Sequence, residues 1–116
     1  RASMSNNECL YANWYALGYE NGSRGQRESK IGEYRKVCAG YRVTPDVERY
    51  VEGRDAGLQV FCEPENGYRL GRAGTAYAGV CPQRLEAEFL RAYGAGRELH
   101  DMEQDNNRPA RRTDAK

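Results

Sequence analysis

The sequence predicts a mainly α-helical fold of about four helices, with a Gly-rich ordered loop or short hairpin between the last two and two disulfides as support. Apolar residues recur at spacings of three and four, which is the period of a helix with one buried face. Leu, Ile, Val and Phe together number only 16 of 116 residues, below the roughly 20% at which disorder becomes a concern. Nine Tyr and one Trp add apolar area, and the net charge is only +1. We therefore expect a thin, aromatic-rich core that needs covalent support.

The four cysteines can supply this support, because each lies in a different segment: Cys9, Cys38, Cys62 and Cys81. The sequence has no Cys-x-x-Cys pair and a single His, so it lacks the ligand spacing of a zinc site. Four separated cysteines in so small a chain favour two disulfides and an oxidising compartment over four buried thiols in a cytosolic protein. Three pairings are possible. We favour Cys9–Cys38 with Cys62–Cys81, because each bond closes a loop of moderate length.

Two helices are expected in the first third of the chain. The first covers residues 10–24, with Trp14, Leu17 and Gly18 on one side, and a polar, Gly-containing stretch ends it. The second is indicated by apolar residues at helical spacing: Ile31, Tyr34, Cys38 and Tyr41. Gly40 is expected to provide a left-handed cap near the end of this second helix.

The third helix has the clearest start. Thr44 offers an N-cap hydroxyl, Pro45 suits the first helical position, and Asp46 places a carboxylate near the positive end of the helix dipole. The predicted buried face consists of Val47, Tyr50, Val51, Leu58 and Phe61. Pro64 disfavours helical geometry at the residue before it, so this helix should stop near Cys62.

Residues 63–81 contain five Gly or Pro residues before Cys81, and we predict an ordered loop there, with a short hairpin or a helical turn. Pro82 can open a last helix, whose apolar face is Leu85, Phe89, Tyr93, Gly96 and Leu99. We predict a single disulfide-stabilised domain over residues 1–103 and a flexible polar tail over residues 104–116.

A Tyr-x-x-Gly pattern recurs along the chain, at Tyr15/Gly18, Tyr19/Gly22, Tyr50/Gly53, Tyr68/Gly71 and Tyr93/Gly96. In the last three an arginine follows the glycine: Arg54, Arg72 and Arg97. A Tyr and the residue four positions later share a helix face, so each ring can lie under a guanidinium. Each Gly inside a helix costs about 1 kcal/mol relative to Ala, which close backbone approach should offset. The pairs Gly18/Gly22 and Gly53/Gly57 therefore predict that the first and third helices cross closely.

Two interpretations of the Tyr–Arg units stay open. In the first, they converge on an anion, sugar or partner site, whose candidate binding residues are Tyr50, Arg54, Tyr68, Arg72, Tyr77, Tyr93 and Arg97. In the second, they are packing devices in which Arg side chains cover aromatic rings at the rim of the core.

Three blocks of sequence carry a family resemblance. The first is Glu8-Cys9 with Trp14-Tyr15-x-x-Gly18-Tyr19-Glu20-Asn21-Gly22. The second is Cys38-Ala39-Gly40 through Thr44-Pro45-Asp46, followed by Tyr50-x-x-Gly53-Arg54-x-x-Gly57-Leu58. The third is Phe61-Cys62-x-Pro64-x-Asn66-Gly67-Tyr68-x-x-Gly71-Arg72-x-Gly74-x-x-Tyr77-x-x-Val80-Cys81-Pro82, with Phe89 and Tyr93-x-x-Gly96-Arg97 after it. Over roughly residues 4–103, the chain resembles an uncharacterised bacterial envelope family, domain of unknown function 2799.

That family looks like one of lipoproteins, made with a signal peptide and a lipidated cysteine. Cys9 matches a position inside the domain, so the resemblance implies that the chain begins just after the anchor. It also implies a location on the periplasmic side of the bacterial envelope, anchored to the outer membrane, with membrane contact only through the N-terminal lipid. No stretch of the chain approaches the roughly 18 apolar residues that span a bilayer. The resemblance brings no known activity, ligand or catalytic residue.

The sequence indicates no catalytic centre, metal or cofactor. The serines Ser3, Ser5, Ser23 and Ser29 are not part of a Gly-x-Ser-x-Gly elbow. His100 is expected on the surface of the last helix. Glycoside hydrolysis uses two carboxylates that flank the scissile bond, and two acidic pairs could supply them: Glu63/Glu65 and Glu86/Glu88. Glutamates at such spacings are usually solvated. Balanced charge argues against nucleic acid, because basic residues are spread between acidic ones, except for Arg108, Arg111 and Arg112 in the tail. We predict that the protein is not an enzyme.

Two non-enzymatic functions remain. The first is an envelope domain that binds a protein partner through its Tyr-, Gly- and Arg-rich surface, since Tyr and Arg are favoured as interface anchors. The second is binding of cell-wall glycan or peptidoglycan fragments, with sugars stacked on tyrosines and anionic groups held by arginines. We favour the protein partner slightly.

Overall fold

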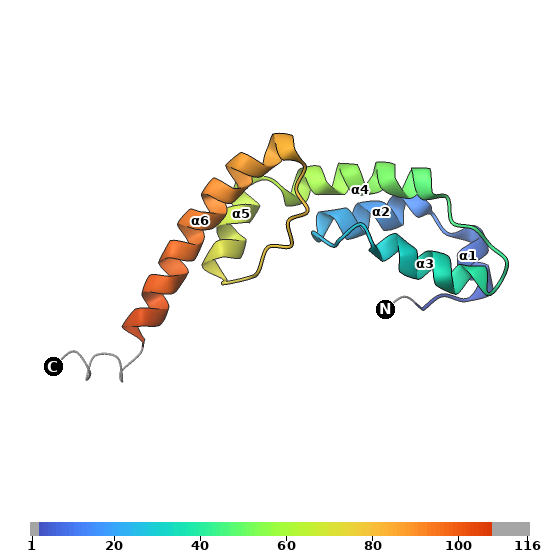
Figure 1. The fold of residues 1–116 in the computed structure, drawn as a ribbon, viewed down its shortest axis with the longest axis horizontal. Coiled ribbons are helices and arrows are strands. Elements are labelled where there is room, and N and C mark those ends of the chain that lie inside the picture. The colour runs from blue at the N-terminus through green and yellow to red at the C-terminus, as the bar shows by residue number, and fades with distance from the viewer. Residues whose placement is uncertain (1–2, 108–116) are drawn as a thin grey trace. The chain divides into compact units, whose positions relative to one another are not determined.

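The structure is a computed structural model that describes residues 3–107, and within these residues it is helical without strands (Figure 1). The mainly α prediction is therefore confirmed, although six helices replace the expected four. They are α1 (Asn6–Tyr11), α2 (Trp14–Ser23), α3 (Lys30–Ala39), α4 (Val47–Phe61), α5 (Pro64–Arg72) and α6 (Gln83–Asn106).

Contacts between Cα atoms divide the described chain into two units. Unit 1 comprises residues 3–61 and 78–81, and unit 2 comprises residues 62–77 and 82–107. Helices α1 to α4 thus belong to unit 1, and α5 and α6 belong to unit 2. The expectation of one domain over residues 1–103 stays a prediction.

The expected first helix is two helices, because local side chains cap the chain twice. At the start of α1, the Ser5 hydroxyl accepts from the Glu8 amide at 3.2 Å, and the Glu8 carboxylate accepts from the Ser5 amide at 2.7 Å. This reciprocal pair is a capping box. Ala12 is extended, and Asn13 then caps α2 by accepting from the Ala16 amide at 3.0 Å. Asn favours such caps over helix interiors, which explains the break.

The second expected helix corresponds to α3 and is shorter than predicted. Tyr34 and Cys38 face the core, but Tyr41 lies beyond the helix and is exposed. Gly40 keeps right-handed helical geometry, with φ at −62°, so the prediction of a left-handed glycine cap was wrong. The left-handed residue in this loop is Arg42, with φ at 63°.

The third expected helix corresponds to α4, and its N-cap is two residues later than predicted. Asp46 accepts from the Arg49 amide at 3.1 Å through its carboxylate, so Asp46 is the N-cap and Thr44 is not. The end of α4 at Phe61 confirms the predicted stop near Cys62. Glu63 is extended, with φ at −68° and ψ at 142°, as the residue before a proline should be.

The segment from 63 to 81 is only half a loop. Pro64 opens the nine-residue helix α5, which is longer than the helical turn that was one of the predicted alternatives for this loop. Pro82 is the N-cap of α6. This helix continues to Asn106, so residues 104–106 of the predicted tail are helical, whereas residues 108–116 lie outside the described part.

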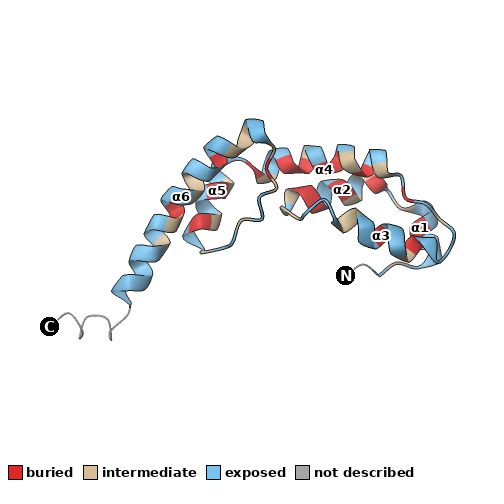
Figure 2. Ribbon diagram, in the orientation of Figure 1, coloured by how far each residue is buried: buried red, intermediate tan, exposed pale blue. Residues whose placement is uncertain are grey.

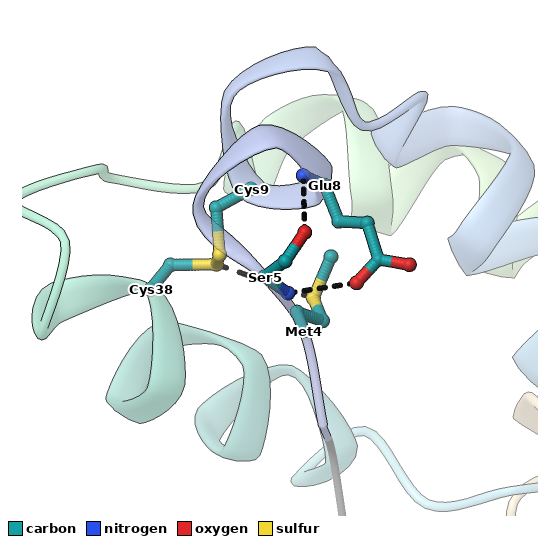
Figure 3. Close-up of a disulfide and its surroundings, with 5 residues drawn as sticks. All are labelled: Met4, Ser5, Glu8, Cys9 and Cys38. Atoms are coloured by element: carbon teal, nitrogen blue, oxygen red, sulfur yellow. Dashed lines mark hydrogen bonds between the residues drawn. A yellow bond between two sulfur atoms is a disulfide. The ribbon is translucent and has the colours of Figure 1, made fainter.

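Unit 1 has an aromatic core closed by a disulfide. The rings of Trp14 and Tyr34, and those of Tyr34 and Tyr50, meet edge to face with centroids 5.9 and 6.1 Å apart. Cys9 and Cys38 are bonded beside them, which confirms the first predicted disulfide (Figure 3). The other two cysteines are also disulfide-bonded, so the chain has two disulfides as predicted.

Glycines set the contact between α2 and α4. A Cβ atom at Gly18 would overlap the Tyr50 carbonyl oxygen, and one at Gly53 would overlap the Tyr15 carbonyl oxygen. One turn later, Gly22 lies against the Arg54 carbonyl. The contacts advance along both helices together, so α2 and α4 run parallel, and the predicted close crossing is confirmed. Figure 2 shows buried residues along the side of α4 that faces α2.

The same arrangement recurs in unit 2 between α5 and α6. A Cβ atom at Gly71 would overlap the Tyr93 carbonyl, and one at Gly96 would overlap the Tyr68 carbonyl. Gly67 lies against the Phe89 carbonyl one turn earlier, so these helices are also parallel. Each unit is thus built on a parallel helix pair in which a Tyr-x-x-Gly segment of each helix packs on the other.

Candidate functional site

The first Tyr–Arg unit lies in the core of unit 1. The Tyr50 side chain is fully buried, and its hydroxyl accepts from Asn21 Nδ2 at 2.5 Å. Arg54 is 8% exposed and donates from Nη2 to the Gln26 carbonyl at 3.0 Å. A fully buried ring cannot stack against a ligand. Tyr50 and Arg54 are therefore packing residues in this structure, and they leave the candidate binding set.

Burial also changes the acidity of this core tyrosine. Desolvation raises the pKa of the Tyr50 hydroxyl, and the hydrogen bond from Asn21 opposes that shift only in part. Asn21 is 4% exposed, and its Nδ2 also lies 3.5 Å from the Tyr34 hydroxyl. The amide of Asn21 thus links the hydroxyls of two core tyrosines.

The other two Tyr–Arg units meet within their own helices in unit 2. Arg97 donates from Nη1 to the Tyr93 hydroxyl at 3.2 Å, and that hydroxyl donates to the Thr75 carbonyl at 2.5 Å. A hydrogen bond with Tyr68 raises the pKa of Arg72, whose Nη2 also pairs with Glu103 Oε2 at 2.8 Å. The Tyr and Arg four residues apart thus meet through hydrogen bonds of the hydroxyl, rather than by the guanidinium lying over the ring as expected.

Tyr77 belongs with the aromatic residues of unit 2. Its ring centroid is 4.9 Å from that of Phe89 and 6.1 Å from that of Tyr93, and its hydroxyl donates to Glu86 Oε2 at 2.8 Å. Tyr77 is half-buried, whereas Tyr68 is 37% exposed. Of the predicted binding residues, the structure leaves Tyr68, Arg72, Tyr93 and Arg97 partly accessible beside the α5–α6 crossing.

The sequence did not indicate a groove that α1, α2 and α3 form in unit 1. It is open and has a volume of about 860 Å³. We call it the α1–α2 groove; its lining residues are Ser3, Met4, Asn7, Glu8, Tyr11, Ala12, Asn13, Ala16, Leu17, Glu20, Lys30 and Tyr34. Tyr11, at its edge, is 81% exposed.

Local contacts hold the wall of this groove that α1 forms. Figure 3 shows Met4 and the Ser5–Glu8 capping box beside the bond between Cys9 and Cys38. The Cys38 sulfur is also 4.0 Å from the Met4 sulfur. The Ser5-x-x-Glu8 capping signature and Asn13 were the sequence signals that could have revealed the separate α1 and, with it, the groove.

The side chains whose types could serve in catalysis, His100 and Glu86, make structural contacts. His100 Nδ1 lies 3.1 Å from the Arg72 carbonyl, and the ring packs on Gly74, whose φ is +74°. Glu86 accepts from Tyr77. Among the described residues, no three His, Cys, Asp or Glu side chains gather as metal ligands would. Within that part of the chain, none of the helices has both the length and the apolar character to cross a bilayer.

A comparison with protein families decides the membership of the chain. The family described as "Protein of unknown function (DUF2799)" matches residues 13–98. The chain belongs to this family. The DUF2799 match spans both glycine crossings, whereas α1 precedes it. No curated protein and no solved structure matches the chain significantly.

Proposed function

We propose that this DUF2799 domain is a non-enzymatic binding module that holds a segment of a protein partner in the α1–α2 groove. The observation that carries the proposal is Tyr11, a large side chain that is 81% exposed at the edge of an open groove. Met4, Leu17 and Tyr34 provide apolar surface inside that groove. Tyr is enriched among the residues that anchor protein interfaces, because it combines apolar area with one polar tip.

The dimensions of the groove fit this role. Its volume of about 860 Å³ lies within the range of concave binding sites in proteins, which is about 300–1,000 Å³. The Cys9–Cys38 bond and the capping box hold α1 in place before any partner binds. A wall that is already ordered loses little conformational entropy on association, which favours affinity.

The location we propose is the periplasmic side of the bacterial envelope, with an N-terminal lipid as the anchor. Two disulfides support it, because such bonds persist in oxidising compartments. The anchoring itself rests on the family resemblance alone. A cysteine-free version expressed in the cytoplasm should fold poorly, whereas the exported protein should contain no free thiol by titration under denaturing conditions.

Cell-wall glycan is the second candidate ligand, because polar side chains line the groove together with the apolar ones. Asn7, Glu8, Asn13 and Glu20 line it beside the exposed Tyr11 ring. Stacking of a sugar on an aromatic ring, with amide and carboxylate partners for its hydroxyls, is a common mode of glycan binding.

The test is site-specific photo-crosslinking. A photo-reactive amino acid replaces Tyr11, and in a matched control it replaces Tyr19, an exposed tyrosine that does not line the groove. Each folded protein is irradiated in envelope extract, and the adducts are treated with muramidase and analysed by peptide mass spectrometry. An adduct from position 11 alone that resists muramidase and contains peptides of a second protein identifies a protein partner, whereas a muramidase-sensitive adduct identifies glycan.

Affinity for the purified partner then provides the second measurement. Tyr11→Ala should weaken binding by about tenfold or more, as for an interface anchor. Tyr19→Ala should change it by less than about twofold. Equal adducts from both positions, or the absence of any adduct from position 11, would exclude the α1–α2 groove as the binding site.

A further inference from the structure

A second groove in unit 1 lies between α3 and the loop that leads to α4. It is open, with a volume of about 580 Å³. We call it the basic groove; its lining residues are Gly32, Arg35, Lys36, Ala39, Arg42, Val43, Thr44 and Pro45. It shares no lining residue with the α1–α2 groove.

Three cations line the basic groove without a matching acid in its lining. Within the described residues, Arg35, Lys36 and Arg42 take part in none of the ion pairs. The neighbouring acid Glu33 pairs with Lys30 at 3.6 Å, and Asp46 caps the Arg49 amide. Residues 24–42 contain six basic and two acidic side chains, although the whole chain has a net charge of only +1. The groove is therefore an electropositive site.

The backbone at Arg42 adds a local cost to this arrangement. Its φ of 63° is the left-handed region, where Arg42 is the single non-Gly residue in the described part of the chain. A residue with a Cβ atom costs about 1–2 kcal/mol in this region. The glycine nearest to it, Gly40, has right-handed geometry, so the left-handed position is occupied by an arginine and not by a glycine. Strained residues of this kind concentrate at functional sites.

Two small residues of α3, Gly32 and Ala39, also line the basic groove. Gly32 lies in the first turn of α3 and has open space where a Cβ atom would be. Unlike Gly18 or Gly53, it makes no close helix contact that would offset its low helix propensity. Ala39 lines the same groove and lies two turns further along the same face of α3. A small, compact ligand can therefore approach the backbone of α3 at Gly32.

We propose that the basic groove binds a phosphate group carried by an organic molecule. Guanidinium groups match the oxygens of phosphate in geometry and charge, and Lys36 adds a third cation while Thr44 adds a hydroxyl. A phosphomonoester carries close to two negative charges and three acceptor oxygens, which suits three cations better than a single carboxylate does. The proposal does not depend on the function of the α1–α2 groove.

The test is a titration of the whole protein, followed by the backbone amide resonances in NMR. The probes are inorganic phosphate, glycerol 3-phosphate, and phosphatidylcholine vesicles with or without phosphatidic acid, all at one ionic strength. Citrate is the carboxylate control. We expect saturable shifts in the amides of residues 32–45 with a phosphate probe, and at least about tenfold weaker binding of citrate.

Two double variants with the same change in charge complete the experiment. Arg35→Ala with Lys36→Ala should weaken phosphate binding by about tenfold or more, since charge-assisted hydrogen bonds are lost. Arg84→Ala with Arg91→Ala, two exposed arginines of α6, should change it by less than about twofold. Melting curves of the variants check that each is folded.

The outcomes show whether the site exists and, if it does, whether its phosphate comes from a soluble molecule or from a lipid. Binding to soluble phosphates indicates a free organic phosphate, and binding to phosphatidic acid vesicles alone indicates a lipid headgroup. Equal binding of citrate and phosphate, equal loss in the two double variants, or an absence of shifts in residues 32–45 with every phosphate probe would overturn the proposal.

Discussion

The Tyr50 hydroxyl lies in the core of unit 1 with the amide of Asn21 as its hydrogen-bond donor. A neutral phenol tolerates this environment, but a phenolate would be a buried negative charge. Desolvation therefore raises the pKa of Tyr50 above its ordinary value of about 10. Because the folded-state pKa is the higher one, the folded state holds this proton more strongly than the unfolded state. Tyr50 thus contributes stability in full below pH 10 and loses it as the pH rises through the folded-state pKa.

The pH dependence of Tyr50→Phe follows from this shift. At pH 7 the variant should be less stable by about 1 kcal/mol, because Asn21 loses a buried partner. Between pH 9 and pH 11 the free energy of unfolding should fall less steeply in the variant than in the wild type. Urea unfolding at a series of pH values measures both slopes. Parallel slopes would mean that ionisation of Tyr50 does not cause the loss of stability at alkaline pH.

At Arg42 we expect a substitution to increase stability. Arg42→Gly removes the left-handed strain and should stabilise the fold by about 0.5–1 kcal/mol, after the larger unfolded-state entropy of Gly is taken into account. Arg42→Ala keeps the strain and removes the same charge, so its stability should stay close to that of the wild type. Thermal melting distinguishes them. A glycine variant that melts no higher than the alanine variant would show that the loop is unstrained.

At the scale of elements, the glycine contacts predict opposite effects for two helix glycines. Gly53→Ala adds a Cβ atom where the Tyr15 carbonyl lies, so it should destabilise the fold by about 2 kcal/mol or more despite the better helix propensity of Ala. Gly94→Ala, on α6, meets open space and should stabilise it by up to about 1 kcal/mol. Unfolding by urea measures both. Equal effects would contradict a close crossing of α2 and α4.

Helix period and glycine spacing predicted α3, α4, α6 and the close crossing, because those signals come from residues on a single helix. The break between α1 and α2 was missed, since the cap at Asn13 competes with an otherwise helical pattern. Helix α5 is longer than the predicted helical turn; the prediction was short because Gly67 and Gly71 are residues typical of loops. Both lie on its contact with α6, and tertiary packing outweighs their low propensity.

The candidate site was predicted less well than the helices, because its exposure depends on how the helices pack. Tyr50 and Arg54 share a motif with Tyr93 and Arg97, yet the first pair is buried and the second is half-exposed. The motif fixes which residues share a helix face, but not what covers that face. The α1–α2 groove and the basic groove are formed by consecutive segments of unit 1, but their walls depend on where one helix ends and the next begins, and helical period alone does not show that. Six basic residues between positions 24 and 42 were the available signal for the second groove.

At the scale of the whole molecule, the two units are stabilised by separate cores. Unit 1 combines its helix pair with the cluster of Trp14, Tyr34 and Tyr50, and unit 2 combines its pair with Phe89 and neighbouring tyrosines. The Cys9–Cys38 bond lies entirely within unit 1 and closes a separation of 29 residues. It joins α1 to α3, and α1 has only six residues, far fewer than the roughly 12–15 that an isolated helix needs.

Replacement of this pair by Cys9→Ala with Cys38→Ala should therefore act locally. Loss of the loop constraint should cost unit 1 about 3 kcal/mol. Amide hydrogen exchange should quicken in α1 to α4, most of all in α1, while α5 and α6 keep their wild-type protection. Photo-crosslinking from position 11 should fall as well, because the wall of the α1–α2 groove is no longer held. Equal loss of protection in α5 and α6 would mean that the two units unfold as one cooperative body, and the stability of each groove would then depend on both cores.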